Sequence, residues 1–161
     1  MSPTPFNIPF NILFLCTGNS ARSILAEATL THLGQGRFRG YSAGSYPKGQ
    51  PNPLALALLQ REGISTDGAR SKSWDEFSAP GAPQLGAVIT VCDQAAGEQC
   101  PLYPGHPLKA HWGVPDPHTE AEFEQAYRAL RGRIERLLAL PAATFGDPAV
   151  LKRQLAVIGA G

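Results

Sequence analysis

Nearly continuous apolar runs alternate with segments of helical spacing along this chain. The runs over residues 10–16 and 86–92 are typical of strands buried on both faces, and residues 38–43 form a further candidate strand. After the first run, apolar residues recur at helical spacing over residues 24–33, and Gly34 is placed to end that helix. Strands that alternate with helices in this order predict βαβ units, a parallel sheet and the α/β class.

The starts of two more helices can be recognised from their capping residues. Asn52 and Pro53 match an N-cap followed by proline at the first helical position, which predicts a helix over residues 54–62. Thr119 and Glu122 have the spacing of a capping box. The helix that they open carries apolar residues at helical spacing, which are Phe123, Tyr127, Leu130, Ile134, Leu137 and Leu138. Such a stripe predicts that one face of this helix is buried.

The length of 161 residues is consistent with one domain. We expect an N-terminal extension over residues 1–10, a main domain over residues 11–140 and a C-terminal tail over residues 141–161. Within the tail, residues 148–157 are expected to form a short helix docked on the main domain. Residues 79–86 are rich in proline and glycine and are expected to form a loop.

Charge and cysteine content narrow the class of protein. Lys and Arg number 14 against 13 Asp and Glu, which gives a net charge of +1 and no reason to expect a nucleic-acid or membrane partner. No apolar run approaches the roughly 18 residues of a membrane helix, and the N-terminus lacks the features of a signal peptide. We therefore expect a cytoplasmic protein. The 3 cysteines are too few for a disulfide scaffold, and disulfides of a reducing compartment tend to be transient and catalytic.

Candidate chemistry begins directly after the first predicted strand, in Cys16-Thr17-Gly18-Asn19-Ser20-Ala21-Arg22 with Ser23 behind. N–H groups of such a loop can form an anion nest, and the helix N-terminus adds partial positive charge. Arg22 can offer a planar fork to two oxygens of an anion, and the positive surroundings favour the reactive thiolate of Cys16. The alternative is a buried structural cysteine before an ordinary strand-to-helix turn.

A second cysteine and an aspartate could lie at the same edge of the sheet as Cys16. Ligands of parallel sheets bind at the carboxyl ends of strands, and Cys16, Cys92 and Asp116 all follow strand-like or extended segments. Cys92 and Cys100 are separated by seven polar or small residues, which would let their thiols approach or separate. Taken alone, Cys92 could simply end a buried strand, Cys100 could be an incidental loop cysteine, and Asp116 could belong to a turn.

The pattern Cys-x5-Arg-Ser resembles the low-molecular-weight protein tyrosine phosphatases, and further segments resemble the arsenate reductases built on that fold. These segments, which run in order from about Asn11 to Leu140, are Leu13-Phe14-Leu15-Cys16-Thr17-Gly18-Asn19-Ser20, Ala26-Glu27, Ser42-Ala43-Gly44, Val88-Ile89-Thr90-Val91-Cys92-Asp93 and His111-Trp112-Gly113-Val114-Pro115-Asp116-Pro117. The resemblance implies a single α/β domain with a four-stranded parallel sheet flanked by helices. It also implies reduction of arsenate to arsenite for arsenic detoxification and resistance.

The same resemblance assigns roles to individual residues. Oxyanion binding falls to Thr17, Gly18, Asn19, Ser20, Ala21, Arg22 and Ser23. Cys16 forms a covalent adduct with arsenate while Asp116 acts as general acid, and a disulfide relay then runs from Cys16 through Cys92 to Cys100. A thioredoxin-type dithiol is the expected reductant, with a glutaredoxin or mycothiol system as alternatives. No cofactor is expected.

A metal site is not predicted either. In some relatives the equivalents of Asn19, Glu27 and Ser42 help to hold a potassium ion, but Trp74 stands where a further acidic ligand is expected. Glu27, one helical turn past the loop, is expected to pair with Arg22 or to cap backbone groups.

Two other functions remain open from the sequence. A phosphatase would use the same loop and Asp116 without Cys92 or Cys100, although His118 and Thr119 stand where such phosphatases often carry tyrosines. A non-catalytic oxyanion or redox sensor would need no general acid.

Overall fold

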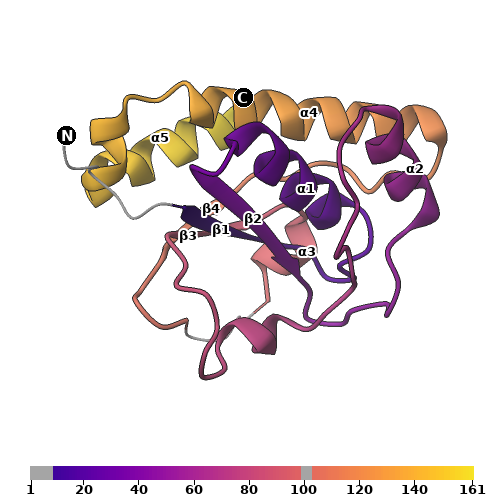
Figure 1. Cartoon of the computed structure of the whole chain (residues 1–161), viewed down its shortest axis with the longest axis horizontal. Coiled ribbons are helices and arrows are strands. Elements are labelled where there is room, and N and C mark those ends of the chain that lie inside the picture. Colours follow the sequence, from indigo (N-terminus) through magenta and orange to yellow (C-terminus); the bar gives the residue numbers. More distant parts are fainter. Residues whose placement is uncertain (1–8, 99–102) are drawn as a thin grey trace.

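The computed structural model describes residues 9–98 and 103–161 and contains one four-stranded parallel sheet (Figure 1). The strands lie in the order β2-β1-β3-β4, so the first strand of the chain is central. Their bounds are β1 Phe10–Leu15, β2 Phe38–Ala43, β3 Ala87–Thr90 and β4 Leu108–His111. Because every pair is parallel, all four carboxyl ends meet at one edge. The predicted α/β class and four-stranded sheet are confirmed.

The alternation of side chains along β1 divides the core into two parts. Ile12 and Phe14 face a large cluster built with the helices, whereas Leu13 and Leu15 face a smaller cluster with Phe77 and other residues of loops and neighbouring strands. All four of these β1 side chains are fully buried. In Figure 1 the long helices accordingly lie on one side of the sheet, and loops with the short helix η1 (Trp74–Phe77) lie on the other.

Four of the helices pack on the larger cluster, and the two with recognised capping residues begin where those residues predict. Their bounds are α1 Arg22–Gly34, α2 Pro53–Arg61, α4 Glu120–Leu138 and α5 Pro148–Ala160. The Asn52 side chain accepts a hydrogen bond from Leu54 N at 2.8 Å. Thr119 Oγ1 accepts from Glu122 N at 3.1 Å while Glu122 Oε1 accepts from Thr119 N at 3.2 Å, which is the reciprocal capping box.

The C-terminal helix packs against the edge strand. Trp112, fully buried just after β4, donates its indole N–H to Leu155 O at 2.9 Å, and Leu151, Leu155 and Ile158 are buried with it. Helix α5 starts at Pro148 as expected and continues to Ala160 rather than ending near residue 157. Among the residues described, no helix combines the length and apolar character that crossing a membrane requires.

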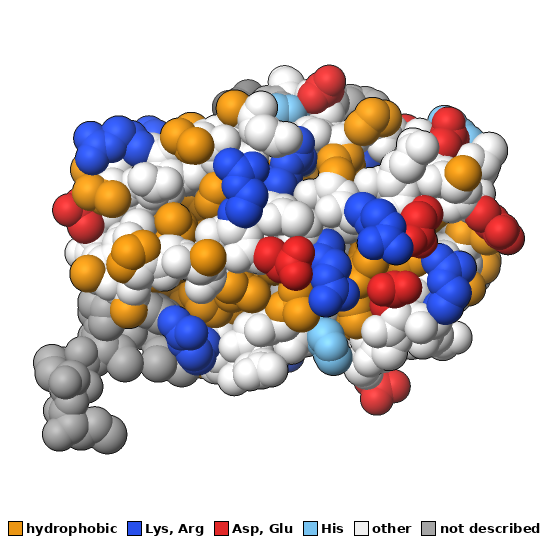
Figure 2. All heavy atoms as spheres, turned by 90° about the horizontal axis from the view of Figure 1, so that it is seen from above, with side chains coloured by type: hydrophobic (Ala, Val, Ile, Leu, Met, Phe, Trp, Pro, Cys, Tyr) orange, Lys and Arg blue, Asp and Glu red, His pale blue; other side chains and the backbone are white. Residues whose placement is uncertain are grey.

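The outer surface of the helical layer carries mixed charges. Figure 2 shows basic and acidic side chains interspersed on this face rather than separated by sign. Ion pairs join Arg128 to Glu124 at 2.7 Å and Arg131 to Glu135 at 3.7 Å, both one turn apart on α4. Such exposed pairs contribute only about 0.3–0.5 kcal/mol each, so α4 is held chiefly by its buried stripe.

Candidate active site

Hydrogen bonds to its backbone carbonyl oxygens hold the loop after β1 in place. Backbone N–H groups of a neighbouring segment donate to Thr17 O at 2.9 Å, Gly18 O at 2.9 Å and Ser20 O at 2.8 Å, and the donors are Tyr46, Lys48 and Asn52. In a trans peptide the C=O and the following N–H point in opposite directions. The N–H groups that follow these carbonyls therefore point away from that segment, which leaves the other side of the loop rich in donors, as an anion nest requires.

Two residues let the loop adopt this shape. Asn19 has a left-handed backbone with φ of 43°, a conformation that asparagine tolerates better than most residues. Gly44 lies against the loop so closely that a Cβ there would collide with the carbonyl oxygens of Thr17 and Cys16. The conformation therefore depends on a motif residue outside the loop as well as on those inside it.

Cys16 directly follows β1 and has 4% of its surface exposed. Its Sγ is 2.9 Å from Ser23 Oγ, and that oxygen also accepts a hydrogen bond from Asn19 Nδ2 at 2.9 Å. An ionised sulfur has no proton to give, so the Ser23 hydroxyl then donates to it. Asn19 and Ser23 are fully buried, so these contacts around the sulfur are shielded from water.

Arg22 and Asp116 meet beside this loop. Arg22 is the first residue of α1, and its Nη1 donates to Val114 O at 3.0 Å while its Nη2 lies 3.4 Å from Asp116 Oδ1. The Asp116 side chain is 58% exposed, against 17% for Arg22. His118 Nε2 lies 3.6 Å from the other Asp116 oxygen. An ion pair this exposed is weak, so Asp116 can leave Arg22 at little cost.

Cys92 is buried next to the same loop. Its surface is 2% exposed, its Sγ accepts from Ala95 N at 3.4 Å, and Thr17 Oγ1 lies 3.8 Å from that sulfur. Cys16 and Cys92 are both free thiols. The structure thus brings together Cys16, Arg22, Cys92 and Asp116, whereas Cys100 falls outside the described residues.

A carboxylate that the sequence does not single out joins the segment after Cys92 to the loop. Glu98 accepts hydrogen bonds from Ser45 Oγ at 2.7 and 2.8 Å, one to each oxygen, and from Thr17 Oγ1 at 3.3 Å. The spacer between the second and third cysteines reads in sequence as polar and flexible. Glu98 is the only glutamate of this spacer, but its contact could not be predicted because the partner, Ser45, lies 53 positions away in the sequence.

Glu27 does not pair with Arg22, contrary to one expectation. Its Oε1 accepts from Ser42 Oγ at 3.0 Å and lies 3.7 Å from Lys72 Nζ. Burial raises the pKa of Glu27, and the charge of Lys72 opposes that rise. Burial in turn lowers the pKa of Lys72, and Glu27 opposes that change. Within the described ranges, no three His, Cys, Asp or Glu side chains gather as metal ligands would.

Comparison with known proteins gives consistent matches. A family model described as low molecular weight phosphotyrosine protein phosphatase matches residues 11–154. The chain is 40% identical over 128 residues to an arsenate reductase of Bacillus licheniformis, covering 76% of this chain and 88% of that one. It is 37% identical over 127 residues to an arsenate reductase of Bacillus subtilis, with the same coverage of 76% and 88%.

Solved structures resemble it as well. An arsenate reductase in the reduced state superposes with a TM-score of 0.67 at 26% identity, over 81% of this chain and 97% of that chain. A thioredoxin-dependent arsenate reductase of Corynebacterium glutamicum gives a TM-score of 0.62 at 27% identity, over 80% of this chain and 60% of that longer one.

Proposed function

This chain belongs to the low molecular weight phosphotyrosine protein phosphatase family, and from that premise we propose that it is an arsenate reductase that uses its own cysteines as the first electron donors. The observation that carries this proposal is the contact between Cys92 and Thr17 in the loop of Cys16. A second thiol at this place takes no part in phosphoester hydrolysis, whereas arsenate reduction by the protein's own cysteines needs one.

Arsenate is a tetrahedral oxyanion, and the loop over residues 17–23 supplies its binding groups. Backbone N–H donors and the guanidinium of Arg22 bind its oxygens, while Ser23 holds the Cys16 sulfur from behind. The Cys16 thiolate attacks arsenic, and one As–O bond breaks. Asp116 gives a proton to the departing oxygen, which leaves as water, and an S–As(V) adduct remains.

Reduction follows when Cys92 attacks the Cys16 sulfur. A disulfide forms between Cys16 and Cys92, and the electron pair of the S–As bond passes to arsenic. Arsenic is thereby reduced from the pentavalent to the trivalent state, and arsenite leaves. Cys100 then attacks Cys92 by thiol–disulfide exchange, which frees Cys16 and leaves a disulfide between Cys92 and Cys100.

A dithiol protein of the thioredoxin type reduces this last disulfide. The structural relative from Corynebacterium glutamicum is named as thioredoxin-dependent, which supports this donor over a glutaredoxin or mycothiol system. For the exchange to occur, the segment after Cys92 has to leave the loop, and the Glu98 bonds to Ser45 and Thr17 then break. Such a cycle fits the reducing cytoplasm, where we place the protein.

A coupled assay with NADPH, thioredoxin and thioredoxin reductase tests the proposal. The wild type should oxidise NADPH with arsenate, and the Cys92→Ser variant should not. Hydrolysis of p-nitrophenyl phosphate, if the wild type has any, should survive in Cys92→Ser, because that reaction needs only Cys16 and Asp116. Phosphatase activity without arsenate turnover in the wild type would favour the phosphatase function, and absence of both would favour a sensor.

A further inference from the structure

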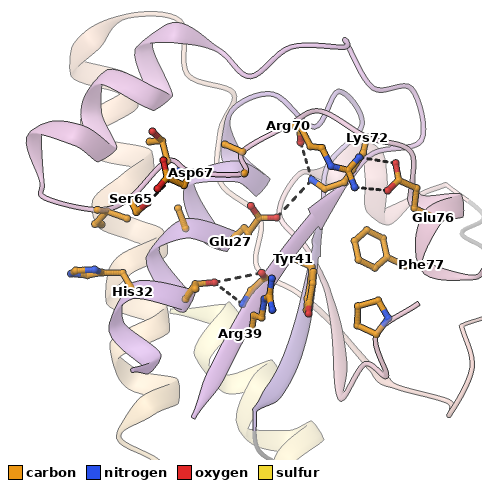
Figure 3. A pocket seen from close by; sticks show the side chains of 18 residues that line it. Glu27, His32, Arg39, Tyr41, Ser65, Asp67, Arg70, Lys72, Glu76 and Phe77 are labelled. Carbon is orange, nitrogen blue, oxygen red and sulfur yellow. Dashed lines mark hydrogen bonds and ion pairs between the residues drawn. The ribbon is translucent and has the colours of Figure 1, made fainter. Parts of the chain in front are cut away.

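A lysine ammonium lies buried behind the loop, among oxygen atoms. The Lys72 residue is 7% exposed, and its Nζ donates to Arg70 O at 2.8 Å and to Ser42 Oγ at 3.3 Å. Oε1 of Glu27 lies 3.7 Å from the same nitrogen. Figure 3 shows this arrangement, with Lys72 between the Glu27 carboxylate and the Arg70 backbone. A carboxylate, a hydroxyl and a carbonyl oxygen therefore surround one positive charge.

These oxygens overlap with the set that the family resemblance links to a potassium ion, namely those of Asn19, Glu27 and Ser42. Two of the expected groups, Glu27 and Ser42, already face the Lys72 ammonium, and the side-chain oxygen of the third, Asn19, accepts from Lys72 N at 2.8 Å. Trp74, at the place of a further acidic ligand, brings no carboxylate. A second cation in contact with Glu27 would meet the like charge of Nζ. The residues present therefore do not fit a bound potassium ion.

We propose that the Lys72 ammonium takes the place of a bound monovalent cation. It positions the Cys16 loop, so the protein needs no such ion from solution. Lys72 is a positioning residue in this proposal, since it touches neither sulfur. The expected effect of Lys72 on catalysis rests on the proposed arsenate reduction. The presence of a cation beside Glu27 does not depend on that function.

A short chain of contacts connects this charge to the sulfur. Lys72 N donates to Asn19 Oδ1 at 2.8 Å, Asn19 Nδ2 donates to Ser23 Oγ at 2.9 Å, and Ser23 Oγ is 2.9 Å from Cys16 Sγ. Lys72 O in addition accepts from Gly44 N at 3.0 Å. The contacts of the ammonium therefore fix the end of the Lys72 side chain, and the backbone of the same residue binds Asn19 and Gly44. Loss of the anchor should therefore move the loop.

The surroundings allow an ion to take the place of the ammonium. Glu27 and Lys72 line a cavity of about 440 Å³ that also reaches Arg39, Arg70 and Glu76. Without Lys72, the largely buried Glu27 carboxylate would lose the positive charge that lies 3.7 Å from its Oε1, and a poorly solvated charge without a partner is unfavourable. Potassium and ammonium ions carry the same single charge and accept similar oxygen surroundings.

The experiment is chemical rescue of Lys72→Ala by monovalent cations. Thermal unfolding and kcat/KM for arsenate are measured in choline, potassium and ammonium chloride at one fixed ionic strength. Wild type should behave alike in all three salts. In choline, Lys72→Ala should have a lower Tm and about 10- to 100-fold lower kcat/KM, as expected for a displaced loop. Potassium or ammonium should restore most of both quantities.

Two further variants serve as controls. Lys72→Met fills more of the space and removes the charge, so it should show the loss in choline without rescue. Arg70→Ala removes an exposed positive charge from the same cavity but keeps the carbonyl that binds Lys72, so it should gain no cation dependence.

Several outcomes would overturn the proposal. These are a Lys72→Ala variant equal to wild type in choline, a damaged variant that no cation improves, or a wild type that itself depends on potassium. If wild type reduces no arsenate, the Tm series still decides the cation site, and only the proposed function fails. If Lys72→Ala is unfolded in every salt, Lys72→Met decides: an unchanged kcat/KM refutes the proposal, and a loss that Glu27→Gln partly reverses supports it.

Discussion

The hydroxyl of Ser23 offers the most direct test of how the protein activates Cys16. Substitution by alanine removes an oxygen 2.9 Å from the sulfur, in a fully buried position that water cannot readily refill. A hydrogen bond to a charged group contributes about 1.5–3 kcal/mol. If that energy is used to stabilise the thiolate, Ser23→Ala should lower kcat/KM for arsenate by about 10- to 150-fold.

The same substitution should also reduce stability, for a separate reason. Asn19 Nδ2 donates to Ser23 Oγ and would lose that acceptor in a fully buried site. An unpaired buried donor costs about 1–3 kcal/mol, and each kcal/mol corresponds to roughly 2–4 °C of Tm in a domain of this size. The variant therefore has to be assayed well below its Tm, so that unfolding does not mimic a catalytic defect.

The assay that isolates the sulfur is alkylation by iodoacetamide at neutral pH, with the label on Cys16 quantified by mass spectrometry. Thiolate, not thiol, reacts, so Ser23→Ala should be labelled more slowly than wild type. Ser78→Ala is a matched control, because the Ser78 hydroxyl also makes one hydrogen bond, to Asp75 O at 3.0 Å on an exposed surface. Equal labelling rates and equal kcat/KM in Ser23→Ala and wild type would refute the reasoning.

Three further predictions concern the relay and the acid. Cys100→Ser should complete one turnover and stall at the disulfide between Cys16 and Cys92, visible by mass spectrometry; repeated turnover with thioredoxin would contradict the relay. Asp116→Asn should slow turnover while phosphate still protects against thermal unfolding, and an unchanged rate would remove its acid role. Glu98→Gln weakens two contacts of its segment, so thioredoxin should reduce the oxidised enzyme faster in stopped-flow fluorescence, and an equal rate would argue against this restraint.

Features governed by neighbours in sequence could be predicted well. The capping box of Thr119 and Glu122 and the N-cap of Asn52 act within one turn, so the starts of α2 and α4 follow from a few residues. The order of strand, loop and helix around Cys16 is equally local, whereas the conformation of the loop also depends on Gly44, which lies outside it.

Features that depend on contacts between segments far apart in the sequence could not be predicted. Strand β4 has only four residues of alternating burial at the edge of the sheet, a pattern too short to distinguish from a loop. Lys72 meets Glu27 from 45 positions away, and a lysine between two serines gives no sign of burial. Glu98 likewise finds Ser45 only after the fold has formed. Polar contacts of this kind carry no periodicity, so only coordinates reveal them.

The contact between Asp116 and Arg22 affects the order of steps in the proposed reaction. An oxyanion that arrives in the loop needs the guanidinium that this aspartate contacts at 3.4 Å, so the two negative groups compete for one cation. In the proposed reaction, an anion that takes over the guanidinium would separate the Asp116 carboxylate from Arg22 and leave it beside the bound oxygens. Asp116 would then be available as the proposed proton donor only while an anion occupies the loop, and it would otherwise remain paired with Arg22.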